Sequence, residues 1–403
     1  MSEPDRSRTR LALGALALGG FGVGATEFVA MGVLPQIAQD LLPQLWATSP
    51  EDAIARAGVV ITAYALGVVL GAATIAAATA KLPRRSLVIA FAVAFTVGSI
   101  LSAMAPTFEL VVIARFLAGL PHGAYFGIAS LIAADLMGPG KRGQGVALVM
   151  SGLTIANVVG VPAITVVGQQ FGWRASYYIV AAVFALATAA IALTVPRQPG
   201  NPRATIRAEL SAFRQPQVWL ALAVGSVGLG GFFAVYSYVA PMVTEVAGLG
   251  QGWVSLALVC IGSGMTVGNL VGGRLADSGA LRAITVLLPV IAAWLVLLWA
   301  VAEQPFLLFA CLFGFGAVTS ALVPSIQTRL MDVAGRAQTL AAALNHAALN
   351  VGNALGAALG GAVIAAQFGY LAPAWVGVGL AVLGLLVALV SRALERRGNP
   401  ADG

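Results

Sequence analysis

Long apolar runs alternate with short polar stretches from one end of the chain to the other. A helix that crosses ~30 Å of hydrocarbon needs about 20 apolar residues, whereas barrel strands need segments of about ten residues with alternating polarity. The runs therefore predict an all-α membrane protein. Its twelve helices are expected near residues 11–37, 55–80, 86–105, 108–134, 144–168, 174–195, 216–240, 252–276, 281–301, 305–330, 337–366 and 370–392.

The longest polar stretch, PRQPGNPRATIRAELSAFRQPQ, begins at Pro196 and divides the apolar runs six and six. Its proline, glycine and arginine content is typical of a surface linker. We therefore predict an N-terminal six-helix bundle at 1–195, a cytoplasmic linker at 196–215 and a C-terminal six-helix bundle at 216–403.

The two halves resemble each other at a nearly constant spacing. Adding 197 takes Gly67 to Gly264 and Phe116 to Phe313, and in the first helix of each half the spacing is 206. Two parallel six-helix repeats are the arrangement of the major facilitator fold, in which substrate binds between the repeats near the bilayer midplane. The duplication therefore predicts a twelve-helix secondary transporter.

The distribution of charge predicts how the chain is oriented in the membrane. Only 9% of residues are charged, against roughly 25% in soluble domains. The net charge of +7 does not indicate a nucleic-acid partner, because the basic residues gather at both termini and in alternate loops. This positive-inside pattern predicts that both termini are cytoplasmic. We expect a monomer whose partners are the lipid bilayer and a small-molecule substrate.

Several chemistries lack any sequence signal. The two cysteines fall inside predicted spans and indicate neither a disulfide framework nor a metal site. No Walker A motif, catalytic triad or metal-ligand spacing is present, so we predict neither direct use of ATP nor an enzyme. A membrane-embedded sensor is disfavoured because no soluble signalling domain is found. We expect no cofactor and a proton gradient as the energy source.

Local motifs along almost the whole chain resemble the arabinose-efflux-permease group, in the drug:proton antiporter branch of the major facilitator superfamily. The resemblance implies export of small molecules driven by inward proton movement, with relatives described as sugar-efflux or as drug and chloramphenicol-efflux proteins. It also implies the bacterial cytoplasmic membrane. The motifs are GATEFVAMGVLP at 24–35, YALGVVLGA at 64–72, RFLAGLPHGAYFG at 115–127, GPGK at 138–141, SGLTIANVVGVP at 151–162, GQQFGWR at 168–174 and NVGNALGAALGG at 350–361.

Three motifs of the superfamily carry expected roles. Arg115 with Gly119 resembles the fourth-helix motif tied to proton coupling, and 152–162 resembles the fifth-helix antiporter motif, with Val-Pro in place of Gly-Pro. The cytoplasmic gate motif is poor in the first half and better kept in the second, where Asp277 and Arg282 form the preferred remnant pair. The expected gate residues are Lys81, Arg84, Arg85, Gly273, Asp277 and Arg282.

Only Glu27 and Arg115 are charged residues well inside predicted spans. A charge at the bilayer centre costs ~2.5–3.5 kcal/mol on insertion scales, so such residues are functional candidates. At 1.5 Å per residue, Glu27 lies ~24 Å from Leu11 and Arg115 ~10 Å below the outer face, so their depths are similar. We predict a pair that alternating access makes and breaks while Glu27 carries the proton. The alternative is a structural acid–base pair that orients two helices.

Other polar residues inside the spans are candidates for proton transfer or for the substrate cavity. His122 shares a helical face with Arg115 and could assist proton transfer, or be a neutral histidine bonded to a neighbouring helix. For each cavity candidate the alternative is ordinary packing or interhelical hydrogen bonding. These candidates are Tyr64, Tyr125, Asn157, Tyr236, Asn269, His346, Asn350 and Asn353.

The predicted function is proton-coupled export of a drug such as chloramphenicol, or of a sugar-like solute. A cavity with mostly aromatic and aliphatic walls would favour a drug, and many convergent hydrogen-bonding groups would favour a sugar. A facilitative uniporter is the alternative. In a uniporter, neutralising Glu27 would leave activity intact.

Overall fold

The computed structural model describes residues 3–79, 82–138, 142–198, 214–334 and 338–398. In these ranges twelve helical segments are long and apolar enough to span a membrane, and all regular structure is helical. The predicted fold class, an all-α membrane protein with twelve spans, is confirmed. The expected linker at 196–215 falls mostly outside the described residues.

The helices follow the order of the predicted spans. The first half contains α1 (Glu3–Gly32), α2 (Leu34–Leu41), α3 (Pro43–Thr48), α4 (Pro50–Ala57), α5 (Val59–Thr79), α6 (Arg84–Met104), α7 (Phe108–Gly119), α8 (His122–Met137), α9 (Arg142–Ile155), the π-helix η1 (Ala156–Gly160), α10 (Val161–Phe171) and α11 (Trp173–Thr194). The second half contains α13 (Pro216–Tyr236), α14 (Val239–Pro241), the π-helix η3 (Met242–Val246), α15 (Gly252–Asp277), α16 (Ala280–Val301), α17 (Pro305–Val333), α18 (Gln338–Ala365) and α19 (Ala372–Gly398).

Prolines explain where the first-half spans are interrupted. A proline lacks a backbone N–H and clashes with the preceding turn, so helices end or widen next to it. The fourth span is broken between α7 and α8 by Pro121, and Pro162 follows the π-helix η1 in the fifth. Pro35 lies in the first turn of α2, just after α1 ends at Gly32.

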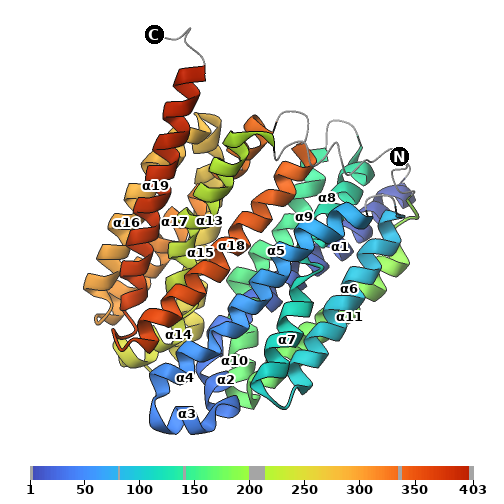
Figure 1. Cartoon of the computed structure of the whole chain (residues 1–403). Coiled ribbons are helices and arrows are strands. Elements are labelled where there is room, and N and C mark those ends of the chain that lie inside the picture. The colour runs from blue at the N-terminus through green and yellow to red at the C-terminus, as the bar shows by residue number, and fades with distance from the viewer. Residues whose placement is uncertain (1–2, 80–81, 139–141, 199–213, 335–337, 399–403) are drawn as a thin grey trace.

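The two halves lie side by side, and α5 of the first half runs next to α18 of the second (Figure 1). Both termini lie at one end of the molecule, and α2, α3 and α4 lie at the other. Between the halves, α5 and α4 pack along α18, while η1 and α10 pack against α15. At the end far from the termini, the Gln36 amide donates to Gln251 (3.0 Å) and the Gln367 amide donates to Asp52 (3.4 Å).

The predicted duplication is visible in the packing of equivalent helices. A Cβ atom at Gly67 would lie 2.1 Å from the Phe116 carbonyl oxygen, and one at Gly264 would lie 1.9 Å from the Phe313 carbonyl oxygen. The helix pairs α5–α7 and α15–α17 are therefore in contact at equivalent residues, 197 positions apart. Only glycine permits this approach of the two backbones, which explains why these glycines recur in both halves.

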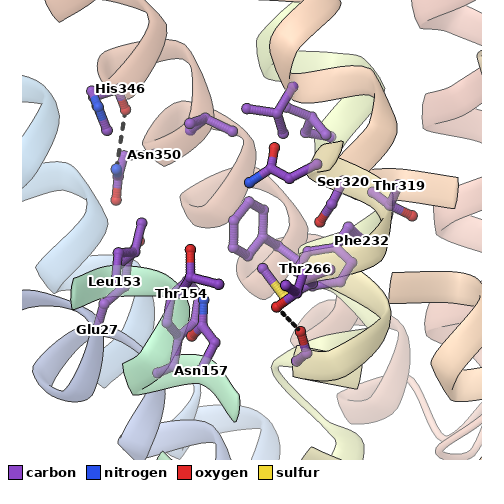
Figure 2. Close-up of a pocket in the computed structure, with 18 of the residues that line it drawn as sticks. Glu27, Leu153, Thr154, Asn157, Phe232, Thr266, Thr319, Ser320, His346 and Asn350 are labelled. Atoms are coloured by element: carbon purple, nitrogen blue, oxygen red, sulfur yellow. Dashed lines mark hydrogen bonds between the residues drawn. The ribbon is translucent and has the colours of Figure 1, made fainter. Parts of the chain in front are cut away.

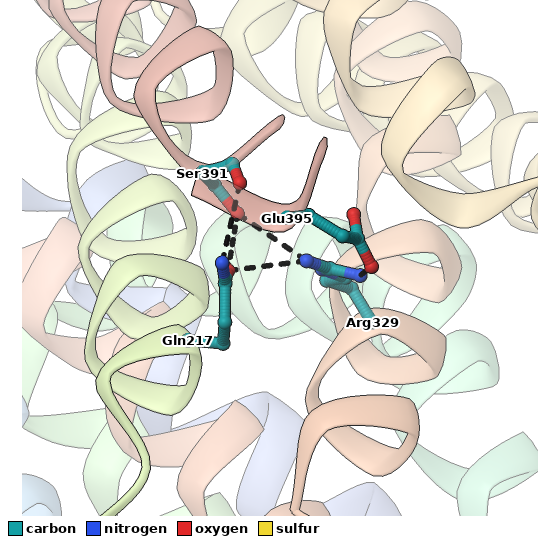
Figure 3. Close-up of polar contacts among 4 residues, drawn as sticks. All are labelled: Gln217, Arg329, Ser391 and Glu395. Carbon is teal, nitrogen blue, oxygen red and sulfur yellow. Dashed lines mark hydrogen bonds and ion pairs between the residues drawn. The ribbon is translucent and has the colours of Figure 1, made fainter. Parts of the chain in front are cut away.

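A buried arginine joins three helices of the second half near the end that carries the termini (Figure 3). From α17, Arg329 donates to Glu395 of α19 (2.9 Å) and to Gln217 of α13 (3.1 Å). Ser391 of α19 lies 3.4 Å from the same guanidinium and donates to Gln217 at 2.6 Å. The buried charge of Arg329 is thus paired with a carboxylate and hydrogen-bonded to neutral acceptors, which lowers the cost of burying it.

Candidate functional site

A cavity of about 110 Å³ lies between the two halves (Figure 2). Pockets for drug-sized ligands enclose ~300–1,000 Å³, so this conformation has to open further to hold one. The wall comprises residues of α1, α8, α9 and η1 from the first half and of α13, α15, α17 and α18 from the second. Its residues are Glu27, Phe28, His122, Leu153, Thr154, Asn157, Leu229, Phe232, Phe233, Gly262, Met265, Thr266, Asn269, Thr319, Ser320, Val323, His346, Leu349 and Asn350.

Most of the predicted polar residues meet at this cavity. Glu27, His122, Asn157 and Asn269 line it, as do His346 and Asn350 of α18. Asn353, also on α18, does not line it and instead contacts Glu27.

The three tyrosines expected at the cavity wall lie elsewhere, which corrects that prediction. Tyr125 is fully buried in the first half and donates to the Leu16 carbonyl oxygen (2.9 Å). Tyr236 is also fully buried and packs against Phe28, with ring centroids 5.5 Å apart. Tyr64 lies beneath Arg115. All three rings pack between helices, where a large side chain buries more apolar surface than at an open wall.

Glu27 connects the first half of the molecule to the second. Its side chain lines the cavity from α1 and is 6% exposed. The side-chain amide of Asn353, on α18, lies 3.5 Å from its carboxyl oxygen. The contact spans the interface between the halves, so the surroundings of Glu27 depend on how the halves are arranged.

Arg115 does not pair with Glu27 in this conformation. Its guanidinium donates to the Thr26 hydroxyl (2.9 Å) and to the Thr26 carbonyl oxygen (2.8 Å). It lies 4.2 Å above the Tyr64 ring and is completely buried, and no described carboxylate lies within 4.0 Å of it. Arg115 therefore bonds Thr26, the residue before Glu27, and not Glu27 itself, because the hydroxyl and carbonyl groups of Thr26 lie nearer to the guanidinium than the carboxylate does.

His122 and Arg115 do not present a common face. The break at Pro121 separates them, so Arg115 remains buried while His122 lines the cavity. The Tyr64 hydroxyl lies 3.1 Å from His122 Nδ1. Across the cavity, the ring of His346 lies 6.2 Å from that of His122. Tyr64 therefore touches both the arginine and a histidine at the interface between the halves.

Asn157 reaches the cavity from the π-helix η1. A π-turn widens the helix and occurs frequently at functional sites. Here its backbone meets the second half closely, since a Cβ atom at Gly262 would lie 2.4 Å from the Asn157 carbonyl oxygen. The π-turn therefore places a polar side chain where the two halves are in close contact.

Sequence reasoning missed part of the wall. Phe28, Phe232 and Phe233 supply aromatic rings, and Thr319 and Ser320 supply hydroxyl groups on α17. In the sequence these residues are marked only by their position in the first, seventh and tenth spans. Many residues that face lipid lie in the same spans, so this position does not identify a cavity wall. Thr26 was missed because a threonine in an apolar helix bonds its own backbone in most cases.

The expected gate residues divide into three groups. Arg84 forms an ion pair with Asp135 of α8 (2.6 Å), and Arg85 donates to the Ala192 carbonyl oxygen of α11, so both join helices within the first half. On α15 and α16, Gly273 has open space beside it and Arg282 is exposed. Lys81 and the side chain of Asp277 lie outside the described residues, so the Asp277–Arg282 pair stays a prediction.

Comparisons with known proteins identify the family. The family model of the Major Facilitator Superfamily matches residues 16–336 and 254–403. The inner membrane transport protein YdhP of Escherichia coli K12 is 38% identical over 380 residues, 94% of this chain and 95% of YdhP. A chloramphenicol resistance protein of Streptomyces lividans is 33% identical over 396 residues, 97% of this chain and 99% of its own length.

Solved structures show the same fold. A bacterial homologue of the human lysosomal transporter Spinster, in an inward-facing and unoccupied conformation, has a TM-score of 0.72 at 16% identity and covers 97% of this chain and 98% of its own. Twelve apolar spans in two equivalent halves, with a polar cavity between them, are the architecture of a multi-pass transporter and not of an enzyme. This chain belongs to the major facilitator superfamily.

Proposed function

We propose that this transporter exports small amphiphilic molecules across the bacterial cytoplasmic membrane in exchange for protons, without a cofactor. The observation that carries the proposal is the position of Glu27. Among the described residues that line the cavity, it is the one acid, and no lysine or arginine accompanies it. A titratable group at the substrate site is what coupling of substrate to protons requires, because both then compete for one place.

Proton coupling would involve Glu27 and Arg115, which are not paired in this conformation. A carboxylate in an apolar cavity is costly, and a nearby guanidinium reduces that cost. Arg115 holds Thr26, the residue next to Glu27, so a small shift of α1 against α7 would change the distance between the two charges. We propose that this shift accompanies alternating access, with Glu27 taking a proton when the two groups are apart.

The orientation follows from the basic residues. If both termini are cytoplasmic, then the contacts Gln36–Gln251 and Asp52–Gln367 close the extracellular side of this conformation. Export would require these contacts to break, so that a ligand taken up from the cytoplasm or inner leaflet leaves on the other side.

The cavity wall favours an amphiphile as the substrate. Three phenylalanine rings, Phe28, Phe232 and Phe233, line the cavity together with amide and hydroxyl groups. A molecule with an aromatic part and several hydroxyl or amide groups matches both surfaces. The chloramphenicol resistance protein among the relatives is in keeping with such a substrate. A sugar is the second candidate, because ten of the lining residues carry polar side chains.

Proteoliposomes with an imposed pH gradient test the proposal. An exchanger concentrates substrate in the acidic compartment, so vesicles with an acidic lumen should accumulate labelled chloramphenicol. A protonophore should abolish the accumulation. Glu27→Gln should reduce it at least tenfold at equal incorporated protein, while Glu109→Gln, which alters an exposed acid outside the cavity, should not.

Three outcomes would contradict parts of the proposal. Undiminished accumulation by Glu27→Gln would exclude Glu27 as the proton carrier. Equilibration without accumulation in wild type would indicate a uniporter. Accumulation of arabinose but not of chloramphenicol would replace the drug-like substrate by a sugar.

A further inference from the structure

Two buried amide oxygens in the cavity wall have no hydrogen-bond partner. They are Oδ1 of Asn157 and Oδ1 of Asn350, whose residues are 5% and 2% exposed. Most buried polar atoms in proteins are paired with protein or ordered water. Both residues line the cavity, one from η1 in the first half and one from α18 in the second (Figure 2).

The hydrogen bond of Asn350 fixes which atom is left unpaired. Its amide nitrogen donates to the His346 carbonyl oxygen (3.0 Å). Rotating the amide by half a turn would place two acceptors against each other, so the oxygen has to be the free atom. In Figure 2 the carboxamide nitrogen of Asn350 makes that bond, and its oxygen points away from His346, on the side where Leu153 and Glu27 are labelled. Asn350 therefore presents a fixed acceptor.

Both halves contribute hydrogen-bond acceptors to the cavity wall. Asn157 and Asn350 each leave an oxygen free, and Glu27 adds a carboxyl group between the halves. No lysine or arginine is among the described lining residues. Three phenylalanine rings line the same cavity.

We infer that Asn157, Asn350 and Glu27 form an acceptor subsite that selects substrates with at least three hydrogen-bond donors, such as hydroxyl or amide N–H groups, beside an aromatic ring. One molecule bonded to both amides is held by both halves of the transporter at once. Both oxygens are almost inaccessible to solvent in this conformation, so water can pair with them only once the cavity opens, as it must to hold a drug-sized ligand. A ligand that displaces the water without offering donors leaves them unpaired, and such sites reject the ligand strongly.

This inference names the substrate class of the proposed exporter and rests on its cavity being the transport site. It is tested by equilibrium binding, which needs no proton gradient. Thiamphenicol carries an aromatic ring, two hydroxyl groups and one amide N–H. Florfenicol differs from it only in that fluorine replaces one hydroxyl group. Labelled forms of both would be measured on purified protein in nanodiscs.

Wild type should bind thiamphenicol at least about tenfold more tightly than florfenicol. Asn350→Leu and Asn157→Leu should each reduce that ratio to about twofold or less, because removing one acceptor removes the discrimination. The matched control is Asn345→Leu. Asn345 also lies on α18, is 3% exposed and has an unpaired Oδ1, but it does not line the cavity, so this variant should keep the wild-type ratio.

Equal binding of the two compounds by wild type would overturn the inference, as would the absence of saturable thiamphenicol binding. These readouts do not depend on how a variant folds. A ratio that falls equally in Asn345→Leu would overturn it too. If the expected ratios are found but an acidic lumen drives no accumulation, the subsite stands and the proton coupling fails. Accumulation together with equal binding would overturn the subsite and leave the proton coupling in place.

Discussion

Among the residues that the structure describes, two arginines are buried, one in each half, and their surroundings differ. Arg329 meets the carboxylate of Glu395 together with Gln217 and Ser391, and thereby joins α13, α17 and α19. Arg115 meets the hydroxyl and carbonyl oxygen of Thr26 and the rings of Tyr64 and Tyr177. Both guanidinium groups are withdrawn from solvent, yet only Arg329 lies within ion-pair distance of a described acid.

The difference separates a structural charge from a functional one. A buried charge that is paired with a carboxylate joins helices and need not change its partners. A buried charge without a neutralising partner is costly and persists where a second state uses it. Arg329 lies near the end that carries the termini, whereas Arg115 bonds the residue next to the acid that lines the cavity. We therefore expect their substitutions to have different effects.

Substituting Arg115 should have the largest effect on transport. Arg115→Lys keeps the charge but loses the planar fork that reaches both oxygens of Thr26. Hydrogen bonds to a charged group contribute about 1.5–3 kcal/mol each, so accumulation of chloramphenicol in acidic vesicles should fall below a tenth of wild type. Initial rates per incorporated protein measure this. Rates above half of wild type would show that the geometry of Arg115 is not needed.

Substituting Arg329 should instead lower stability. Arg329→Met fills similar space and leaves Glu395, whose side chain is 50% exposed, free to reach water. Breaking a buried pair costs up to about 3–5 kcal/mol, and the exposure of Glu395 places this case at or below the lower bound. Thermal unfolding in detergent should shift down by several degrees, with transport per folded molecule within threefold of wild type. Lost transport at unchanged stability would contradict a structural role.

The Tyr64 hydroxyl tests the link between Arg115 and His122. Tyr64→Phe removes the contact to His122 Nδ1 at 3.1 Å but keeps the ring beneath the guanidinium. A neutral hydrogen bond contributes about 1 kcal/mol, so we expect a small loss of stability and transport within about threefold of wild type. Tyr64→Leu also removes the ring, whose interaction with a cation contributes about 0.5–2 kcal/mol, and should be worse. Equal effects of both variants would show that the ring contributes nothing.

The smallest effect on stability is expected for an exposed ion pair. Arg174 and Trp173 donate to Asp40. Partial burial alone would raise the pKa of Asp40, but these hydrogen bonds and the charge of Arg174 outweigh it and hold the pKa below its usual value. The carboxylate therefore stabilises the fold above pH ~4, the unfolded pKa, and this contribution is lost as pH falls through the lower folded pKa.

The measurement is the unfolding temperature of Asp40→Asn and of wild type between pH 7 and pH 3.5. Because the pair is half exposed, the difference at pH 7 should correspond to less than about 1 kcal/mol and should shrink in the acid range. Glu109→Gln is the control, since Glu109 contacts Arg56 only at 3.9 Å with both side chains exposed, and should not change the unfolding temperature at pH 7. A difference that grows as pH falls would contradict the assignment.

Hydropathy and spacing predicted most of the fold. Apolar runs located all twelve spans, and matches 197 residues apart revealed a duplication that the contacts at Gly67 and Gly264 repeat. The interruptions were harder, because a proline in an apolar run can bend, end or widen a helix. Pro35 separates two helices, Pro121 breaks a span and Pro162 follows a π-turn.

The candidate site was predicted less completely. Glu27, His122, Asn157, Asn269, His346 and Asn350 were chosen because polar groups in apolar helices are expensive, and all six line the cavity. Tyr64, Tyr125 and Tyr236 were chosen because each offers an apolar body and one hydrogen bond, but they are packed between helices. A tyrosine has an apolar body and one polar atom, so it fits both a cavity wall and the space between packed helices. Residue type alone therefore does not predict which of the two positions it takes.

By itself, then, the sequence determined the class, the spans, the duplication and the two charged residues inside the membrane, because these depend on the local free energy of moving each segment from water into hydrocarbon. Only the tertiary structure decided that Arg115 bonds Thr26 and not Glu27, that Asn353 reaches Glu27 from the other half, and that Asn157 and Asn350 leave acceptors free. Partner choice depends on helix rotation and on distances of a few ångströms between helices, which no periodicity along one chain contains.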